Sequence, residues 1–168
     1  MAAKTKIILR KSVKVLHEIG AVGVLGAFAA FMVLLATAPP PDSLAAYAAS
    51  RQGIAAIAKW LLVPSLGLVL TSGLLAMIAN DSYIDAGWAW IKALLGLSMF
   101  EGSLVTVAGS ARHAAELSAL AVSGHGDPAE LAAVLHTEWG SLWLLMVLSL
   151  ANIVLAVWRP RLSLDLAP

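Results

Sequence analysis

One stretch of the sequence decides the fold class. Residues 139–158 read WGSLWLLMVLSLANIVLAVW and contain no charged side chain. Crossing the hydrocarbon core of a bilayer takes about 20 mostly apolar residues in a helix. The stretch therefore predicts a transmembrane helix with a tryptophan at each end, where aromatic side chains anchor helices at the two membrane surfaces.

Three further segments have the same character. The four predicted spans are residues 15–37, 57–79, 88–111 and 139–158. The chain is 60% hydrophobic and 12% charged, which is too few charges to cover a soluble domain, and it lacks the series of short alternating segments that a membrane β-barrel needs. The sequence predicts an all-α, polytopic membrane four-helix bundle that forms one domain of 168 residues.

Basic residues gather near the two chain ends. They are Lys4, Lys6, Arg10, Lys11 and Lys14 before the first span and Arg159 and Arg161 after the fourth. Cytoplasmic segments of membrane proteins carry an excess of Lys and Arg, and four spans put both termini on one side. We therefore expect a multi-pass protein of the bacterial inner (plasma) membrane with both termini in the cytoplasm.

Two of the helices are predicted to extend beyond the bilayer as an outer hairpin. Gly124 is a typical helix stop, and Asp127-Pro128 is a typical helix start. We expect the third helix to run from about 86 to 123 and the fourth from 128 to 158. Residues 42–52 are expected to extend the second helix outward. Gly20, Gly23, Gly26 and Ala30 recur on one side of the first helix, which favours close helix packing.

Four polar residues, one from each helix, are predicted at one depth near the cytoplasmic side. They are His17, Ser72, Lys92 and Asn152. Polar and ionisable residues in membrane spans usually face the interior of the bundle and are functional. The alternative is that Lys92 extends to the membrane surface beside Trp88 and Trp90, and that His17 is an ordinary interfacial residue. The sequence leaves both possibilities open.

Two residues of the third helix lie deeper. Met99 follows Lys92 by seven residues and shares its helix face. Glu101 follows Lys92 by nine residues, and we expect it to face the interior, either paired with an interior group or protonated. An interior carboxyl is typical of a proton path or a quinone site. The predicted cofactor-binding residues are His17, Lys92, Met99, Glu101 and Asn152.

A pair of histidines suggests a second site in the outer hairpin. His113 and His136 lie at nearly equal distances from the turn at 124–125, and Glu116 shares a helix face with His113. Two histidines and one carboxylate suffice to bind copper, zinc or iron. The alternative, which we favour, is a salt-bridged hairpin in which Arg112 pairs with Glu116 or Glu138.

Three short segments resemble one group of membrane proteins. Helix 1 reads Val15-Leu16-His17-Glu18-Ile19-Gly20, helix 3 opens Trp88-Ala89-Trp90-Ile91-Lys92, and helix 4 ends Trp158-Arg159-Pro160. These segments resemble a four-helix superfamily that includes copper-resistance D proteins, HemJ-type protoporphyrinogen oxidases and a branch of uncharacterised predicted membrane proteins.

The resemblance implies roles for particular residues. In the oxidase branch the histidine of helix 1 is implicated in binding haem b, and a lysine in helix 3 is typical of the family. The resemblance gives these positions to His17 and Lys92, with Met99 or another residue as a second ligand. Ser98-Met99-Phe100 stands where the oxidase branch has a tyrosine-histidine pair, so the uncharacterised branch matches best.

Together these observations predict an integral membrane protein that binds haem, a metal or a quinone in a four-helix core and has a redox- or assembly-related role. The alternatives are a small copper or proton transport protein and an accessory subunit of a larger membrane complex, and self-association is also open. Whether the protein is an enzyme stays open, although no phosphate loop or HExxH motif is present. The net charge of +1 gives no reason to expect a nucleic-acid partner.

Overall fold

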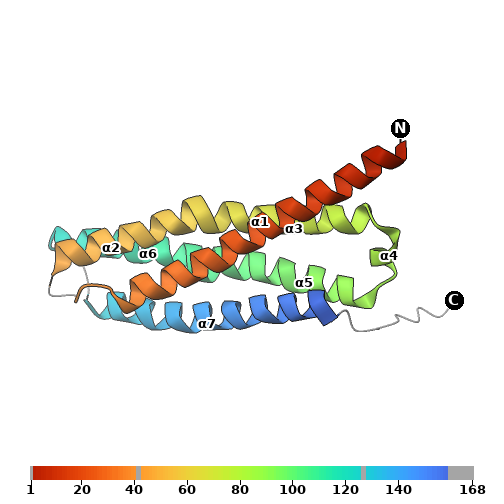
Figure 1. The fold of residues 1–168 in the computed structure, drawn as a ribbon. Coiled ribbons are helices and arrows are strands. Elements are labelled where there is room, and N and C mark those ends of the chain that lie inside the picture. The colour runs from red at the N-terminus through yellow and green to blue at the C-terminus, as the bar shows by residue number, and fades with distance from the viewer. Residues whose placement is uncertain (1, 41–42, 126–127, 159–168) are drawn as a thin grey trace.

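Four long helical rods lie side by side in the computed structural model (Figure 1). It describes residues 2–40, 43–125 and 128–158, without the side chains of residues 2, 3, 81, 128, 129, 131–133, 135 and 136. The helical elements are α1 (Ala2–Ala36), α2 (Leu44–Ile57), η1 (Ala58–Leu62), α3 (Val63–Ile78), α4 (Asp81–Ile84), α5 (Gly87–Gly102), η2 (Ser103–Gly109), α6 (Ser110–Val122) and α7 (Pro128–Trp158).

The rods are made of consecutive elements. α1 is the first rod, α2–η1–α3 the second, α5–η2–α6 the third and α7 the fourth. Each rod packs against its neighbours in sequence, and the fourth also packs against the first. α1 and α5 therefore lie diagonally across the bundle. The described residues include no strand, and the predicted all-α four-helix fold is confirmed.

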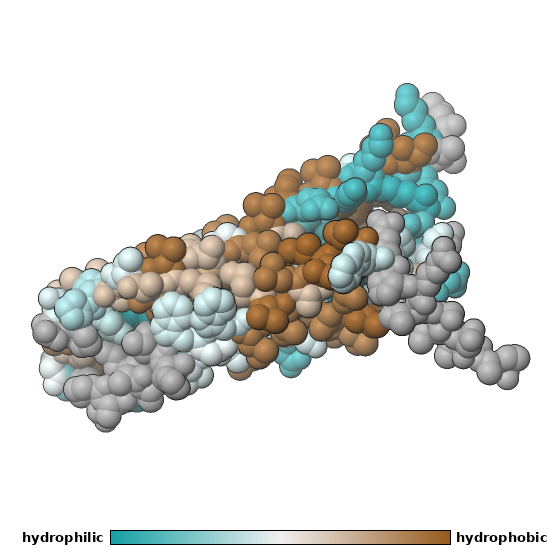
Figure 2. All heavy atoms as spheres, turned by 60° about the horizontal axis from the view of Figure 1, so that its bottom comes forward, coloured by the Kyte–Doolittle hydropathy of each residue, from teal (hydrophilic) through white to brown (hydrophobic). Residues whose placement is uncertain are grey.

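Each rod is long enough and apolar enough to cross a membrane. The four candidate spans are Lys4–Ala36, Leu44–Ile78, Gly87–Val122 and Thr137–Trp158. Large apolar side chains cover much of the bundle surface, and brown, hydrophobic residues form most of its middle in Figure 2. Such a surface is unsuited to water and suited to lipid. The chain is a multi-pass integral membrane protein.

The two ends of the bundle differ. We call the end that holds α4 and the protruding start of α1 the basic end, and the end that holds the α1–α2 link and the α6–α7 connection the hairpin end. Teal, hydrophilic residues gather on the protruding part of α1 in Figure 2, where Lys4, Lys6, Arg10, Lys11 and Lys14 are all exposed.

The helical extensions at the hairpin end are as predicted. α6 ends at Val122 and α7 begins at Pro128. Gly124 has a φ of +82°, and the N–H groups of Gly124 and His125 donate to the carbonyls of Ala121 and Leu120. This is the Schellman arrangement, which satisfies the last carbonyls of a helix and favours glycine at the left-handed position. The predicted cap at Asp127 lies outside the described residues.

Both middle rods contain a wide π-helical turn. In the second rod this turn, η1, comes directly before Pro64, and the N–H of Val63 donates to the carbonyl of Ala58. Proline has no N–H, and its ring clashes with the carbonyl four residues earlier, so a wider turn lets the helix continue past it. In the third rod, η2 lies opposite η1. Pro64 is therefore accommodated by a local widening within a continuous helix.

Two of the glycines explain the close approach of α1 and α3. A Cβ atom on Gly20 would lie 2.8 Å from Cγ2 of Val69 and 3.0 Å from its backbone N, and a Cβ on Gly23 would meet the side chain of Ser65. Only residues without side chains allow backbones to approach this closely. The prediction for Gly26 was wrong, because it is exposed and a Cβ there would meet nothing within 4 Å.

Candidate functional site

A cavity of about 450 Å³ opens at the basic end, between α1, α3, α5 and the last turns of α7. A smaller cavity of about 90 Å³ adjoins it toward the middle of the bundle. His17, Lys92 and Asn152 line both cavities. Three of the five predicted cofactor-binding residues therefore meet at the junction of the two cavities, although they come from three different helices.

The ring of His17 is held by α3. Its Nδ1 lies 3.1 Å from the carbonyl oxygen of Val69 and 3.2 Å from Oγ of Ser72. A carbonyl can only accept a hydrogen bond, so this contact places the ring proton on Nδ1. Nε2 then keeps its lone pair, which is the arrangement found when a histidine is oriented to bind a metal through its other nitrogen.

Neighbouring residues of α3 make room for this histidine. A Cβ atom on Gly73 would lie 3.4 Å from Cε1 of His17, so a larger residue would press on the ring. Ser72 is buried, and its hydroxyl donates to the carbonyl of Leu68. The hydroxyl proton is used in that bond, so the oxygen is free to accept from His17. The predicted juxtaposition of His17 and Ser72 is confirmed.

Lys92 and Asn152 connect α5 to α7. Nζ of Lys92 donates to the backbone carbonyl oxygen of Asn152 at 3.0 Å. The side-chain Oδ1 of Asn152 is buried and accepts no hydrogen bond from the described residues. A buried polar atom without a partner is unusual in a folded protein. Because Asn152 lines both cavities, this acceptor is available to a ligand there.

Met99 lies in the smaller cavity together with His17. Its side chain is 7% exposed, and its thioether is a soft sulfur donor of the kind that binds haem iron in some cytochromes. Apolar residues form most of the remaining wall of this cavity, and Ser149 adds one hydroxyl, which donates to the carbonyl of Leu145. Met99, His17 and Lys92 thus line one cavity, and the role of Met99 as a ligand stays a prediction.

The mouth of the larger cavity is rich in charged side chains. Arg10, Lys11, Lys14 and Glu18 line it, with Lys92 farther inside. Four cations against one carboxylate give this mouth an excess of positive charge, which favours an anionic group. Arg10 is also fixed to the opposite wall, because its Nε donates to the carbonyl of Ala79 at 2.9 Å.

Glu101 does not belong to this site. Its side chain is exposed, and it lines neither cavity. The prediction that Glu101 faces the interior was wrong. The helix turns about 100° per residue, so residues 92 and 101 lie a half-turn apart around the axis, and the wide turn η2 begins two residues after Glu101.

Two of the three residues of the predicted metal site, His113 and Glu116, pair with other side chains. Glu116 pairs with Arg112 at 3.4 Å, and Nε2 of His113 lies 3.6 Å from Glu130. All four side chains are exposed. The side chain of His136 lies outside the described residues. Among those described, no cluster of three or more His, Asp or Glu is arranged to hold a metal ion, and the alternative of a salt-bridged hairpin is supported.

A buried ion pair near the hairpin end escaped the sequence analysis. Nη2 of Arg51 donates to Oε2 of Glu138 at 2.5 Å, and the two side chains are 1% and 5% exposed. Arg51 also lies 5.9 Å from the ring centre of Tyr47. The signal was present in helical periodicity, because Tyr47, Arg51 and Ile54 lie on one face of α2 and all three are buried.

Comparisons of this chain with protein-family models, with curated proteins and with solved structures found no match in any of the three.

Proposed function

We propose that this integral membrane protein binds haem b in the cavity at the basic end, with Nε2 of His17 as a ligand to the iron. The observation that carries the proposal is the hydrogen bond from Nδ1 of His17 to the carbonyl of Val69. It fixes the tautomer and leaves Nε2 with a free lone pair, as the partners of a metal-binding histidine do. Haem supplies one-electron redox chemistry when it is bound.

The surroundings of His17 suit an amphipathic group with anionic substituents. The larger cavity, at about 450 Å³, is within the range of about 300–1,000 Å³ that is typical of cofactor pockets. Its inner wall is mostly apolar, and its mouth carries Arg10, Lys11 and Lys14. Apolar walls exclude water from a macrocycle, and cations at the mouth stabilise its carboxylates. Met99, buried in the adjoining cavity, is the candidate for a second ligand.

The resemblance of the first helix to the haem-binding branch of the four-helix superfamily supports the same position for the ligand. In that branch the histidine of helix 1 is implicated in binding haem, and the corresponding histidine of this chain is His17. The role that we infer is electron transfer or cofactor assembly within the membrane.

A quinol is the second candidate for this cavity, and Asn152 favours it. A quinol hydroxyl needs an acceptor, and both Oδ1 of Asn152 and Nε2 of His17 are available as acceptors near the junction of the cavities. The two ligands are distinguished by absorption, because haem gives an intense Soret band and a quinol does not.

The charge of the basic end supports an orientation in the membrane. Five Lys and Arg residues are exposed at the start of α1, whereas the exposed cation Arg112 near the hairpin end is paired with Glu116. By the positive-inside rule we propose that the basic end faces the cytoplasm and the hairpin faces outside. In a bacterium this describes a protein of the inner membrane whose cavity opens toward the cytoplasm.

The direct test is an absorption spectrum of protein purified in mild detergent from haem-replete cells. We expect a Soret band that is lost in His17→Ala and unchanged in the control His125→Ala, because His125 is exposed in the turn at the hairpin end. Met99→Leu is expected to shift the band. A colourless wild-type protein that also fails to take up added haem would overturn the proposal.

A further inference from the structure

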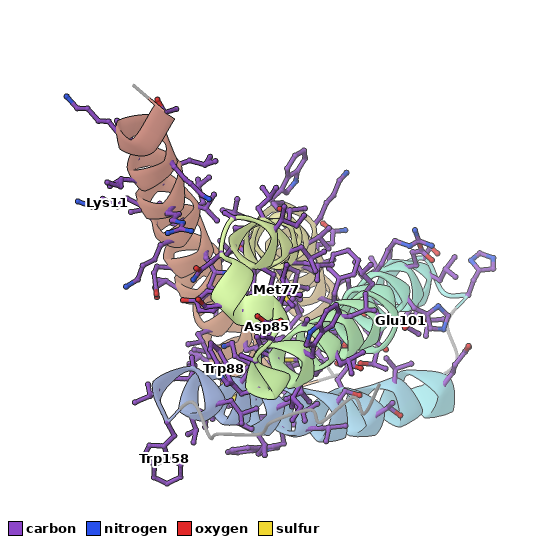
Figure 3. The ribbon with its side chains drawn as sticks, turned by 90° about the vertical axis from the view of Figure 1, so that its right-hand side faces the viewer. Lys11, Met77, Asp85, Trp88, Glu101 and Trp158 are labelled. Carbon is purple, nitrogen blue, oxygen red and sulfur yellow. The ribbon has the colours of Figure 1, made fainter. Side chains whose placement is uncertain are left out.

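The exposed carboxyl of Glu101 is an anomaly on the membrane-facing side of α5. It makes no hydrogen bond or ion pair with any other described residue, and in Figure 3 it lies on the side of the bundle away from α1. Leu94, Leu97 and Val105 share its helix face and are 63%, 51% and 68% exposed. Within the part of the chain that the structure describes, this stripe is left exposed.

The depth of Glu101 places it inside the hydrocarbon. Trp90 marks the basic side of the third rod, where its Nε1 donates to the carbonyl of Ile84. Glu101 follows Trp90 by eleven residues, which is about 16 Å of helix. The hydrocarbon core is about 30 Å thick, so Glu101 lies near its middle. Carboxyls at such positions almost always face a protein interior or a partner.

We propose that the stripe around Glu101 is the interface of a parallel homodimer. A neutral carboxyl both donates and accepts hydrogen bonds, so two copies of Glu101 are complementary to each other. Copies inserted in the same orientation are related by a two-fold axis along the membrane normal, and this axis places both carboxyls at the same depth. The carboxyl group in hydrocarbon thereby gains the partner that the monomer lacks.

The placement of the cations argues against a salt bridge across this interface. Lys59 lies in η1, which is opposite η2, and its ammonium group packs over the ring of Trp60. Arg112 is paired with Glu116. Lys59 and Arg112, the exposed cations on the hairpin side of Glu101 among the described residues, are thus each engaged by an aromatic ring or a carboxylate, and the second carboxyl is the complementary group that the chain offers.

The spacing along the stripe fits two parallel helices. Leu94, Leu97, Glu101 and Val105 are separated by three, four and four residues, which keeps them on one side of a helix over three turns. Apolar side chains on both sides of Glu101 would shield the hydrogen-bonded pair from lipid. The inference is independent of the proposed haem site, because none of these residues lines either cavity.

Cysteine cross-linking in native membranes tests the proposal, since the chain has no cysteine of its own. Leu97→Cys lies one turn from Glu101 and is expected to give a disulfide-linked dimer on mild oxidation. Val22→Cys is the matched control, because Val22 is 70% exposed on α1, diagonally across the bundle from α5. It is expected to remain monomeric.

A second substitution tests the role of the carboxyl. Adding Glu101→Leu to Leu97→Cys is expected to weaken dimerisation about 3- to 20-fold, which corresponds to the loss of one hydrogen-bonded contact between helices in a membrane. Glu101→Gln is expected to retain the dimer, because an amide also donates and accepts. Since the exposed Glu101 side chain makes no hydrogen bond or ion pair with the described residues, Glu101→Leu should leave the helical content and the unfolding of the monomer unchanged.

Three results would overturn the proposal. They are equal cross-linking with and without Glu101→Leu, cross-linking at Val22→Cys as strong as at Leu97→Cys, and a cross-linked product whose mass differs from two copies of the chain. The last result would identify a different protein as the partner of this stripe.

Discussion

At the hairpin end the buried cation Arg51 has its counter-ion Glu138 at 2.5 Å, whereas at the basic end Lys92 contacts a backbone carbonyl and faces an open cavity. The arrangement at the hairpin end joins α2 to α7 through a buried ion pair. The arrangement at the basic end leaves hydrogen-bond acceptors and a positively charged cavity mouth available to a ligand. Charged residues in the same bundle thus form a buried ion pair at one end and line an open cavity at the other.

The difference follows from what surrounds each group. Arg51 is enclosed by the side chains of α2, α6 and α7, so its charge must be neutralised locally. Lys92 lies beside a cavity of about 450 Å³, where water or a ligand can solvate its ammonium group. A buried charge therefore indicates a function only when free space lies next to it.

The largest effect is expected from breaking the ion pair at the hairpin end. Arg51→Met leaves the carboxylate of Glu138 buried without a counter-ion, and we expect the free energy of unfolding to fall by about 3–5 kcal/mol. Denaturation in a titration of mild detergent with SDS measures this change. Adding Glu138→Leu to Arg51→Met should recover most of the loss, and failure to recover would show that the pair is not a structural element.

A smaller loss is expected where α1 approaches α3. Gly20→Leu inserts a side chain where a Cβ alone would come within 2.8 Å of Val69, and overpacking of this kind costs about 1–3 kcal/mol. The same SDS titration measures it, with Gly26→Leu as the control because that position is open. Equal stability of the two variants would contradict the close packing.

Ser72→Ala tests how the basic end holds His17. The substitution removes one of two contacts to Nδ1 and keeps the bond to the carbonyl of Val69. We expect haem affinity to fall about tenfold, since residues that orient a metal-binding histidine contribute about 10- to 100-fold. Haem titration followed at the Soret band measures this, with Ser141→Ala near the hairpin end as the control. An unchanged affinity would exclude a role for Ser72.

The smallest effect is expected from the exposed pair at the hairpin end. Arg112→Ala removes a contact of 3.4 Å between side chains that are 82% and 61% exposed. Exposed pairs one helical turn apart contribute about 0.3–0.5 kcal/mol, so the unfolding curve should hardly move. A loss comparable to that of Arg51→Met would show that the two pairs are equivalent, and would remove the distinction between buried and exposed charges at this end.

Much of the architecture could be predicted from local sequence, and the site only in part. Long uncharged stretches predict helices wherever they occur, and the turn at Gly124 and the start at Pro128 follow from backbone preferences of single residues. His17, Ser72, Lys92 and Asn152 were placed at one depth by counting the helical rise. Whether the side chain of Glu101 points inward or outward was not predictable in this way. That direction depends on how α5 is rotated about its own axis against α3 and α7.

The sequence by itself determined that four apolar helices cross a membrane, where they begin and end, and which end carries the basic residues, because these properties depend on composition and on nearest neighbours along the chain. The tertiary structure decided which polar groups meet. It enclosed Arg51 with Glu138, gathered His17, Met99 and Lys92 around a cavity, and turned Glu101 outward, because each outcome depends on the rotation and contact of helices that are distant in sequence.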